Sequence, residues 1–216
     1  MAEPAKTRVL GAILYPGFEV LDYYGPIEMF GNVGPELRVL TVAERPGPVR
    51  SVQGPETVAT HGFADCPALD LILLPGGFGT VEQLENRAML DFLRQRSAAA
   101  EVTMSVCSGS AILAKAGLLD GRRATSNKMY FGLATAQSDR VDWIAEARWV
   151  EDGPFVTSSG VSAGTDMALA VIARLYGEEK AQRLAEYTEY QRHTDAAVDP
   201  FHRFLNQAMG AAASVP

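Results

Sequence analysis

The sequence predicts an α/β protein with an open, mostly parallel sheet and helices on both faces of that sheet. Two observations predict this fold class. Short apolar runs alternate with segments of helical periodicity along the chain, which is the order that builds parallel sheets from strand-helix-strand units. The run at 69–74 is apolar at almost every position and stops at Pro75-Gly76-Gly77, as expected of a strand buried on both faces. The chain has 216 residues, enough to bury a full core, and we expect residues 1–216 to form a single domain.

The first half of the chain predicts three strands of the sheet, a small β-hairpin excursion beside it and two helices. The strands are apolar runs that end at turn residues, and the helices gather apolar residues on one side. In chain order, the predicted elements are a strand at 7–15, a helix at 21–33 that begins near Asp22, a strand at 37–43, hairpin strands at 49–52 and 57–60, a strand at 69–74 and a helix at 80–99.

The second half repeats the strand-turn-helix pattern and then becomes mainly helical. A Glu-Asp-Gly-Pro turn separates two of its strands, and a buried helix follows them. The predicted elements are a strand at 102–106, a helix at 111–119, a short strand at 122–126, strands at 141–150 and 155–158, a helix at 163–176, a mostly helical stretch at 178–209 and a frayed tail at 211–216.

Composition narrows the class of partner. The net charge is −7 and charged residues make up 21% of the chain, which argues against a nucleic-acid-binding surface. No apolar run approaches the roughly 20 residues that span a bilayer, and the first six residues lack the pattern of a secretion signal. We therefore expect a cytoplasmic protein that acts on a small-molecule substrate, with no nucleic-acid and no membrane partner.

The cysteines and histidines are too few for a disulfide framework or a metal site. The chain contains Cys66 and Cys107, and its three histidines are His61, His193 and His202. None of them forms the closely spaced pairs that are typical of zinc ligands. We expect two free thiols and no metal, with Cys66 in a packing role and the histidines at surface or capping positions.

The segment that points most directly to chemistry is Val106-Cys107-Ser108-Gly109-Ser110, where an apolar strand turns into a helix. Small residues after the cysteine are also found in the strand-turn-helix elbows that present a catalytic nucleophile. The free N–H groups of a first helical turn favour the thiolate. We predict that Cys107 is a reactive thiol with a lowered pKa, the alternative being an ordinary buried cysteine.

Two other turns follow strands that a parallel sheet brings to the same edge as Cys107. Asp22 follows the first strand, where it could share a proton with the thiol or simply cap the next helix. Gly76 and Gly77 follow the central strand, where their backbone N–H groups could stabilise a developing anion or simply form a tight turn. We predict that these turns and Cys107 meet at one site.

Five segments of the chain, in this order, resemble the ThiJ/PfpI family of the class I glutamine amidotransferase-like superfamily, and the resemblance covers nearly the whole chain. Within that family the chain is most similar to the isonitrile hydratase branch, whose members carry the same Leu-Asp, Gly-Pro and elbow cysteine. The matching segments are 15–26 (YPGFEVLDYYGP), 74–77 (LPGG), 105–110 (SVCSGS), 116–125 (AGLLDGRRAT) and 160–166 (GVSAGTD).

The resemblance implies a flavodoxin-like three-layer sandwich that forms a homodimer. It also implies a lyase that needs no cofactor and hydrates an isonitrile to an N-formamide, with Cys107 as nucleophile and Asp22 as general acid and base. It implies that Gly77 and Ser108 offer backbone N–H groups to the substrate and the developing anion, and we expect Gly76, from its place in the same turn, to bind there as well. The Ser108 hydroxyl takes the place of a threonine that is common in that branch.

One position departs from the family pattern. Relatives usually have a histidine just after the Arg-Ala-Thr strand, whereas this chain has Ser126 and Asn127 there. We expect both residues in the pocket, and because Asn127 cannot titrate, a cysteine-histidine pair of the protease or amidase kind is disfavoured. Two other functions stay open: an oxidation-sensing or stress-protective protein whose thiol is oxidised, and a ligand-sensing domain related to transcriptional regulators.

Overall fold

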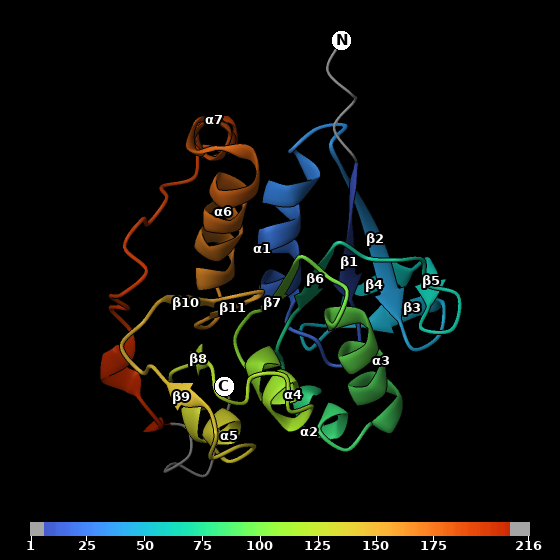
Figure 1. The fold of residues 1–216 in the computed structure, drawn as a ribbon, viewed down its shortest axis with the longest axis vertical. Helices are drawn as coiled ribbons and strands as arrows, with labels where there is room; N and C mark the ends of the chain where they lie inside the picture. The colour runs from blue at the N-terminus through green and yellow to red at the C-terminus, as the bar shows by residue number, and fades with distance from the viewer. Residues whose placement is uncertain (1–6, 208–216) are drawn as a thin grey trace.

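The computed structural model describes residues 7–207 and contains a seven-stranded sheet with the strand order β10-β11-β7-β6-β1-β2-β5 (Figure 1). All neighbours in it are parallel except β10 and β11. The predicted α/β class with a mostly parallel sheet is therefore confirmed. The strands are β1 (Arg8–Ile13), β2 (Leu37–Ala43), β5 (His61–Gly62), β6 (Leu71–Leu74), β7 (Val102–Ser105), β10 (Trp149–Asp152) and β11 (Phe155–Ser158).

Helices cover both faces of the sheet, so the molecule has three layers (Figure 1). One face carries α1 (Val20–Gly31), α6 (Ala163–Tyr176) and α7 (Glu178–Tyr187), and the other carries α2 (Thr80–Gln83), α3 (Arg87–Ser97), α4 (Gly109–Lys115) and α5 (Phe131–Thr135). Within residues 7–207, no helix has both the length and the apolar character needed to cross a membrane.

Two small sheets lie outside the main one. The first is the predicted hairpin, in which β3 (Gly47–Arg50) pairs antiparallel with β4 (Glu56–Ala59). The second pairs β8 (Arg123–Ala124) in parallel with β9 (Asp142–Trp143). Strand β8 ends directly before Thr125, and the turn that follows it carries Asn127.

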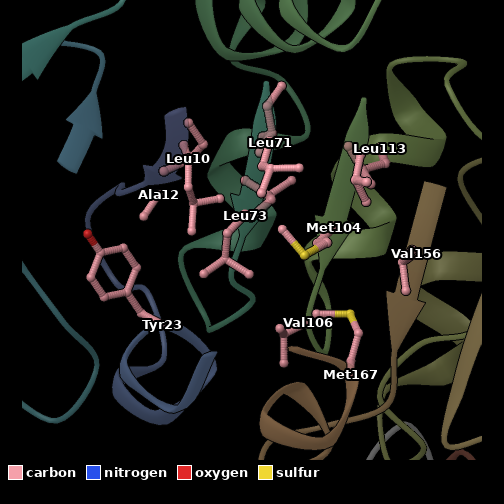
Figure 2. Packing of buried hydrophobic residues seen from close by; sticks show 14 of the residues in the cluster. Leu10, Ala12, Tyr23, Leu71, Leu73, Met104, Val106, Leu113, Val156 and Met167 are labelled. Atoms are coloured by element: carbon pink, nitrogen blue, oxygen red, sulfur yellow. The ribbon is translucent and has the colours of Figure 1, made fainter. Parts of the chain in front are cut away.

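The core lies on the central strands. Figure 2 shows Leu10 of β1, Leu71 and Leu73 of β6 and Met104 of β7 next to one another, and all four side chains are fully buried. The register places Leu10 opposite Leu71 and Leu73 opposite Met104. Because β1, β6 and β7 run in the same direction, the turns after them meet at one edge of the sheet, where the active site is expected.

Three predicted elements have other bounds in the structure, and for the first the cause is local. The predicted helix at 80–99 is broken into α2 and α3, because the Asn86 side chain accepts the N–H of Met89 at 3.2 Å and starts a new helix. The predicted strand at 141–150 is two short strands, β9 and β10. The first helix begins at Val20 rather than near Asp22.

The predicted helical stretch at 178–209 is mostly wrong. Helix α7 ends at Tyr187, and between 188 and 206 the chain is irregular apart from a short 3₁₀ helix, η1 (His202–Phe204). Positions 208 and 209 lie outside the described residues. The segment at 188–201 forms hydrogen bonds with other parts of the chain instead, as when the N–H of Arg148 donates to the carbonyl of Ala196 at 2.8 Å. These tertiary hydrogen bonds take the place of the hydrogen bonds within a helix. The tail predicted at 211–216 lies outside the described residues.

Candidate active site

Cys107 lies on a strained turn between β7 and α4. Its φ is 58°, in the left-handed region that few residues other than glycine adopt. The turn is held in place because the Cys107 N–H points at the carbonyls of Ser158 and Ser159, each 3.2 Å away. Gly109 permits the close approach, since a Cβ there would lie 2.6 Å from the Leu74 carbonyl oxygen. This geometry is that of the elbow expected from the sequence.

Asp22 lies in the first turn of α1, fully buried, and its side chain faces the sheet edge instead of the helix end. Its Oδ2 accepts the N–H of Gly76 at 2.9 Å. Its Oδ1 is buried and has no hydrogen-bond partner of ordinary geometry among residues 7–207, while the carboxyl as a whole lies against the Cys107 thiol, whose contact lowers the Asp22 pKa slightly. The residue at the N-cap position is Glu19, and the N–H of Val20 at the start of the helix donates to Gln53 Oε1, not to Asp22. The capping interpretation of Asp22 is therefore wrong.

Burial raises the pKa of both groups of this pair. The pKa of Asp22 is well above its ordinary value because the carboxyl is desolvated, and the Gly76 N–H offsets only part of that rise. The pKa of the Cys107 thiol is also well above its ordinary value, first because of burial and then because of the Asp22 charge. The prediction of a lowered thiol pKa is therefore wrong, since burial beside a carboxyl outweighs the N–H groups of the short helix α4.

Two N–H groups nevertheless favour the anionic sulfur. The side-chain amide of Asn127 donates from Nδ2 to Cys107 Sγ at 3.1 Å. The orientation of that amide follows from its other end, because Oδ1 accepts the N–H of Tyr130 at 3.0 Å. The backbone N–H of Ser108 also lowers the pKa of Cys107. Asn127 thus gives the sulfur a hydrogen-bond donor that cannot itself take up a proton.

The backbone amides of Gly76 and Gly77 already have partners. The Gly76 N–H donates to Asp22, and the Gly77 N–H donates to Ser108 Oγ at 3.1 Å. Neither is a free donor for a developing anion in this structure. Gly76 instead gives space, because a Cβ there would lie 2.5 Å from Ser108 Oγ and 3.0 Å from Asp22 Oδ2. Three of the predicted site residues, Asp22, Gly76 and Ser108, are thereby packed together.

Ser126 lies behind the nucleophile. Its Oγ donates to the Cys107 carbonyl at 3.1 Å, so it supports the turn and does not reach the sulfur. Cys66 is buried in the hydrophobic core, in agreement with its predicted packing role. Among residues 7–207, no group of three or more His, Cys, Asp or Glu side chains could hold a metal ion.

A cavity of about 370 Å³ opens over Cys107. Its walls are mainly apolar and come from five regions of the chain, so no local sequence pattern indicates it. The residues that line it are Glu19, Gly77, Phe78, Val81, Cys107, Ser108, Asn127, Met129, Tyr130, Leu133 and Val161. The arrangement can hold a small apolar molecule against a buried thiol and a buried carboxyl group.

Three contributors to the site carry no sequence signal that identifies them individually. Thr80 Oγ1 lies 2.9 Å from Ser108 Oγ and 3.1 Å from the hydroxyl of Tyr15, which connects three buried hydroxyls behind the site. Gly160 lies beside the thiol, and a Cβ there would collide with Asn127 Nδ2 and lie 3.3 Å from Cys107 Sγ. Only the tertiary fold brings these residues to the nucleophile.

Residues 7–174 match the model of the DJ-1/PfpI family. The chain belongs to the DJ-1/PfpI family. Its relatives include the isonitrile hydratase of Pseudomonas putida, to which it is 37% identical over 84% of this chain and 78% of that protein. Another member, protein dj-1beta of Drosophila melanogaster, is 26% identical over 81% of this chain and 92% of its own length.

A solved structure supports the same assignment. The crystal structure of a ThiJ/PfpI family protein from Pseudomonas syringae is 34% identical and has a TM-score of 0.79, covering 95% of this chain and 86% of that one. The expected flavodoxin-like sandwich of this DJ-1/PfpI protein is thereby confirmed.

Proposed function

We propose that this protein hydrates isonitriles to N-formamides, with Cys107 as nucleophile and Asp22 as general acid and base. The observation that carries the proposal is the Asp22 carboxyl, buried beside the thiol with Oδ1 unpartnered among the described residues. A protonated carboxyl in that position has a proton to donate. The similarity to an isonitrile hydratase over most of the chain supports the same choice.

The reactive form is the pair with a single proton, held on Asp22 while the charge is on sulfur. The terminal carbon of the isonitrile takes the Asp22 proton, and Cys107 Sγ forms a bond to the same carbon. The product of this step is a thioimidate with a carbon-nitrogen double bond, and Asp22 is left as a carboxylate. The N–H groups of Asn127 and Ser108 stabilise the thiolate before the attack.

Water completes the reaction. The Asp22 carboxylate takes a proton from water as the oxygen adds to the thioimidate carbon, and it passes that proton to the nitrogen. The tetrahedral intermediate then returns its hydroxyl proton to Asp22, and the carbon-sulfur bond breaks. An N-formamide leaves, and the sum of these steps is the addition of one water to the isonitrile.

Asn127 favours this chemistry over hydrolysis of an amide. A cysteine-histidine hydrolase uses an imidazole to protonate the leaving amine. The group nearest the thiol on that side is an amide that holds its orientation through Tyr130. Isonitrile hydration expels no amine, so a single acid-base carboxyl is sufficient.

Formamide production from alkyl and aryl isonitriles tests the proposal. The purified protein is incubated with a panel of both kinds, and N-formamides are quantified by liquid chromatography, with methylglyoxal and a peptide amide as competing substrate classes. We expect formamide from at least one isonitrile and none from the Cys107→Ala variant. Consumption of methylglyoxal or the amide without any formamide product would overturn the proposal.

A homodimer and a cytoplasmic location stay predictions. The apolar side chains of Leu21 and Tyr24 on α1 and of Val58 on β4 are exposed in this chain, and a second copy could cover them. Sedimentation of the purified protein checks the dimer, since a monomer at all concentrations would contradict it.

A further inference from the structure

The cavity over Cys107 carries one formal charge on its walls. Of the described residues that line it, Glu19 is the only one with an ionisable acidic or basic side chain apart from the thiol and the phenol of Tyr130. No lysine or arginine between residues 7 and 207 lines it. Lys128 stands between the lining residues Asn127 and Met129 in the sequence but does not line the cavity. Its Nζ donates instead to Thr125 Oγ1 at 2.8 Å and to the Ala147 carbonyl at 2.6 Å.

Glu19 is fixed in place from both its side chain and its backbone. Its Oε1 accepts the Nε2 of Gln53 at 2.6 Å, and Gln53 Oε1 accepts the N–H of Val20 at 3.1 Å. Its own N–H donates to the Gly76 carbonyl at 2.8 Å. Neither Gln53 nor Val20 is a cation, so these contacts orient the carboxylate without neutralising it.

The negative charge of Glu19 acts on both Asp22 and Cys107. Its charge raises the pKa of Asp22 and, as the weakest of the contributions, that of Cys107. A charge at the wall of a mainly apolar cavity acts on any ion inside it more strongly than it would in bulk solvent. An anion in the cavity would meet this carboxylate without a compensating cation on the walls.

We propose that Glu19 makes the cavity selective for charge, so that it takes neutral or positively charged molecules and rejects anions. The aromatic walls agree with this ligand class. Phe78 and Tyr130 pack edge to face with ring centroids 6.1 Å apart, and aromatic faces attract organic cations, not anions. As a statement on substrates, the inference rests on the proposed function; as a statement on the cavity, it can be tested without that function.

Alkylation of Cys107 tests the cavity alone. Each reagent loses its halide as Sγ forms a bond to its carbon, and the thiol proton goes to solvent. The rates are measured by mass spectrometry of the Cys107 peptide, which excludes signal from Cys66. The reagents are anionic iodoacetate, neutral iodoacetamide and cationic 2-bromoethylamine. Ratios between reagents cancel any change in the thiolate fraction, because all three attack the same sulfur.

We expect the iodoacetamide-to-iodoacetate ratio at Cys107 to fall by at least about tenfold in Glu19→Gln relative to the unchanged protein, and the 2-bromoethylamine-to-iodoacetate ratio to fall further. Glu28→Gln is the matched control, because it removes the same charge from an exposed position of α1. Equal ratios in Glu19→Gln and the unchanged protein would overturn the inference. So would a shift of the same size in Glu28→Gln, which would mean an effect of net charge.

Substrate selectivity is the second measurement. Aryl isonitriles that carry a para methyl, trimethylammonium or carboxylate group are compared by kcat/KM. We expect the carboxylate to be the poorest substrate and to gain at least about tenfold relative to the methyl compound in Glu19→Gln. If no isonitrile is hydrated but the alkylation ratios shift as expected, the proposed function fails and the charge selectivity stands. If isonitriles are hydrated without regard to charge, the selectivity fails and the function stands.

Discussion

Two buried polar clusters lie next to each other in this molecule and are built in opposite ways. Around Cys107, the charges that shift the pKa of Asp22 and of the thiol are carboxylates, and burial raises the pKa of both groups. In the second cluster, Arg148 lies 2.6 Å from Asp166 and 4.0 Å from Asp199, and Lys128 lies 3.7 Å from Asp199. We call the second set, Lys128, Arg148, Asp166 and Asp199, the paired cluster.

The difference shows that buried polar side chains stabilise the fold in the paired cluster and are suited to chemistry at Cys107. The paired cluster ties the irregular segment after α7 to α6, since Asp166 Oδ1 also accepts the N–H of His193 at 2.9 Å. Its charges offset one another, although burial still lowers the pKa of Lys128 to about 8. Within residues 7–207, no lysine or arginine is among the groups that shift the pKa of Asp22 or Cys107. Buried groups left in that state are the ones whose proton affinity is shifted toward catalysis.

The largest expected effect is on stability and falls on the paired cluster. Asp166→Ala removes the close partner of the buried Arg148 and leaves it only Asp199, 4.0 Å away, so we expect a loss of about 3 kcal/mol in the free energy of unfolding. Urea denaturation followed by circular dichroism measures this. Glu151→Ala is the control, because its pair with Arg174 at 2.9 Å is partly exposed and should contribute less than about 1 kcal/mol. Equal losses in both variants would contradict the distinction.

The next largest effect is on isonitrile turnover and concerns Cys107 and Asp22. Cys107→Ala and Asp22→Asn should each lose more than about a hundredfold of isonitrile turnover, or about 2.7 kcal/mol of transition-state stabilisation. Both should destabilise the fold less than Asp166→Ala does, because neither leaves a charge unpaired. Initial rates of formamide formation and urea denaturation provide the two readouts. An active Asp22→Asn enzyme would refute the acid-base role.

The pH dependence of the thiol should sharpen the comparison. Since the pKa of Cys107 is raised, its alkylation by iodoacetamide should increase with pH and reach half its maximum above the value of about 8.5 for an ordinary thiol. Asp22→Asn should move that midpoint to lower pH, because the carboxylate disfavours the thiolate. A midpoint that does not move would mean that the two groups do not share their titration.

The smallest expected effect concerns Asn127. Asn127→Ala removes a donor to the sulfur, and a hydrogen bond to a charged group of about 1.4 kcal/mol corresponds to about tenfold in turnover. Ser126→Ala is the matched control, because Ser126 donates to the Cys107 carbonyl and not to the sulfur. Rates of the two variants at one pH are sufficient. If both variants lose the same fraction of turnover, the hydrogen bond from Asn127 to the sulfur makes no specific contribution.

The parts of the fold that follow from local patterns could be predicted from the sequence. Apolar runs ending at turn residues located β1, β6 and β7, and their parallel order brought Asp22, Gly76 and Cys107 to one edge. The strained turn at Cys107 was indicated by the small residues that follow it. These features depend on neighbours within a few positions, or on the general geometry of parallel sheets.

What could not be predicted depends on distant partners. The segment after Tyr187 has helical composition but is irregular, because its polar groups bond to Arg148 and Asp166. The sequence indicated that Cys107 lies at the start of a helix, which lowers the pKa of a thiol. It did not indicate that the thiol is buried beside Asp22, which raises its pKa by more. The occupied amides of Gly76 and Gly77 were missed for the same reason.

The left-handed backbone of Cys107 has a consequence for the history of the chain. A side chain at φ 58° costs stability of order 1 kcal/mol or more, whereas glycine adopts that conformation freely. Backbone strain alone therefore favours the loss of the nucleophile. Drift without selection for the chemistry would tend to replace this cysteine early, and would leave a molecule that still folds, with its cavity and its carboxyl group but nothing to attack with.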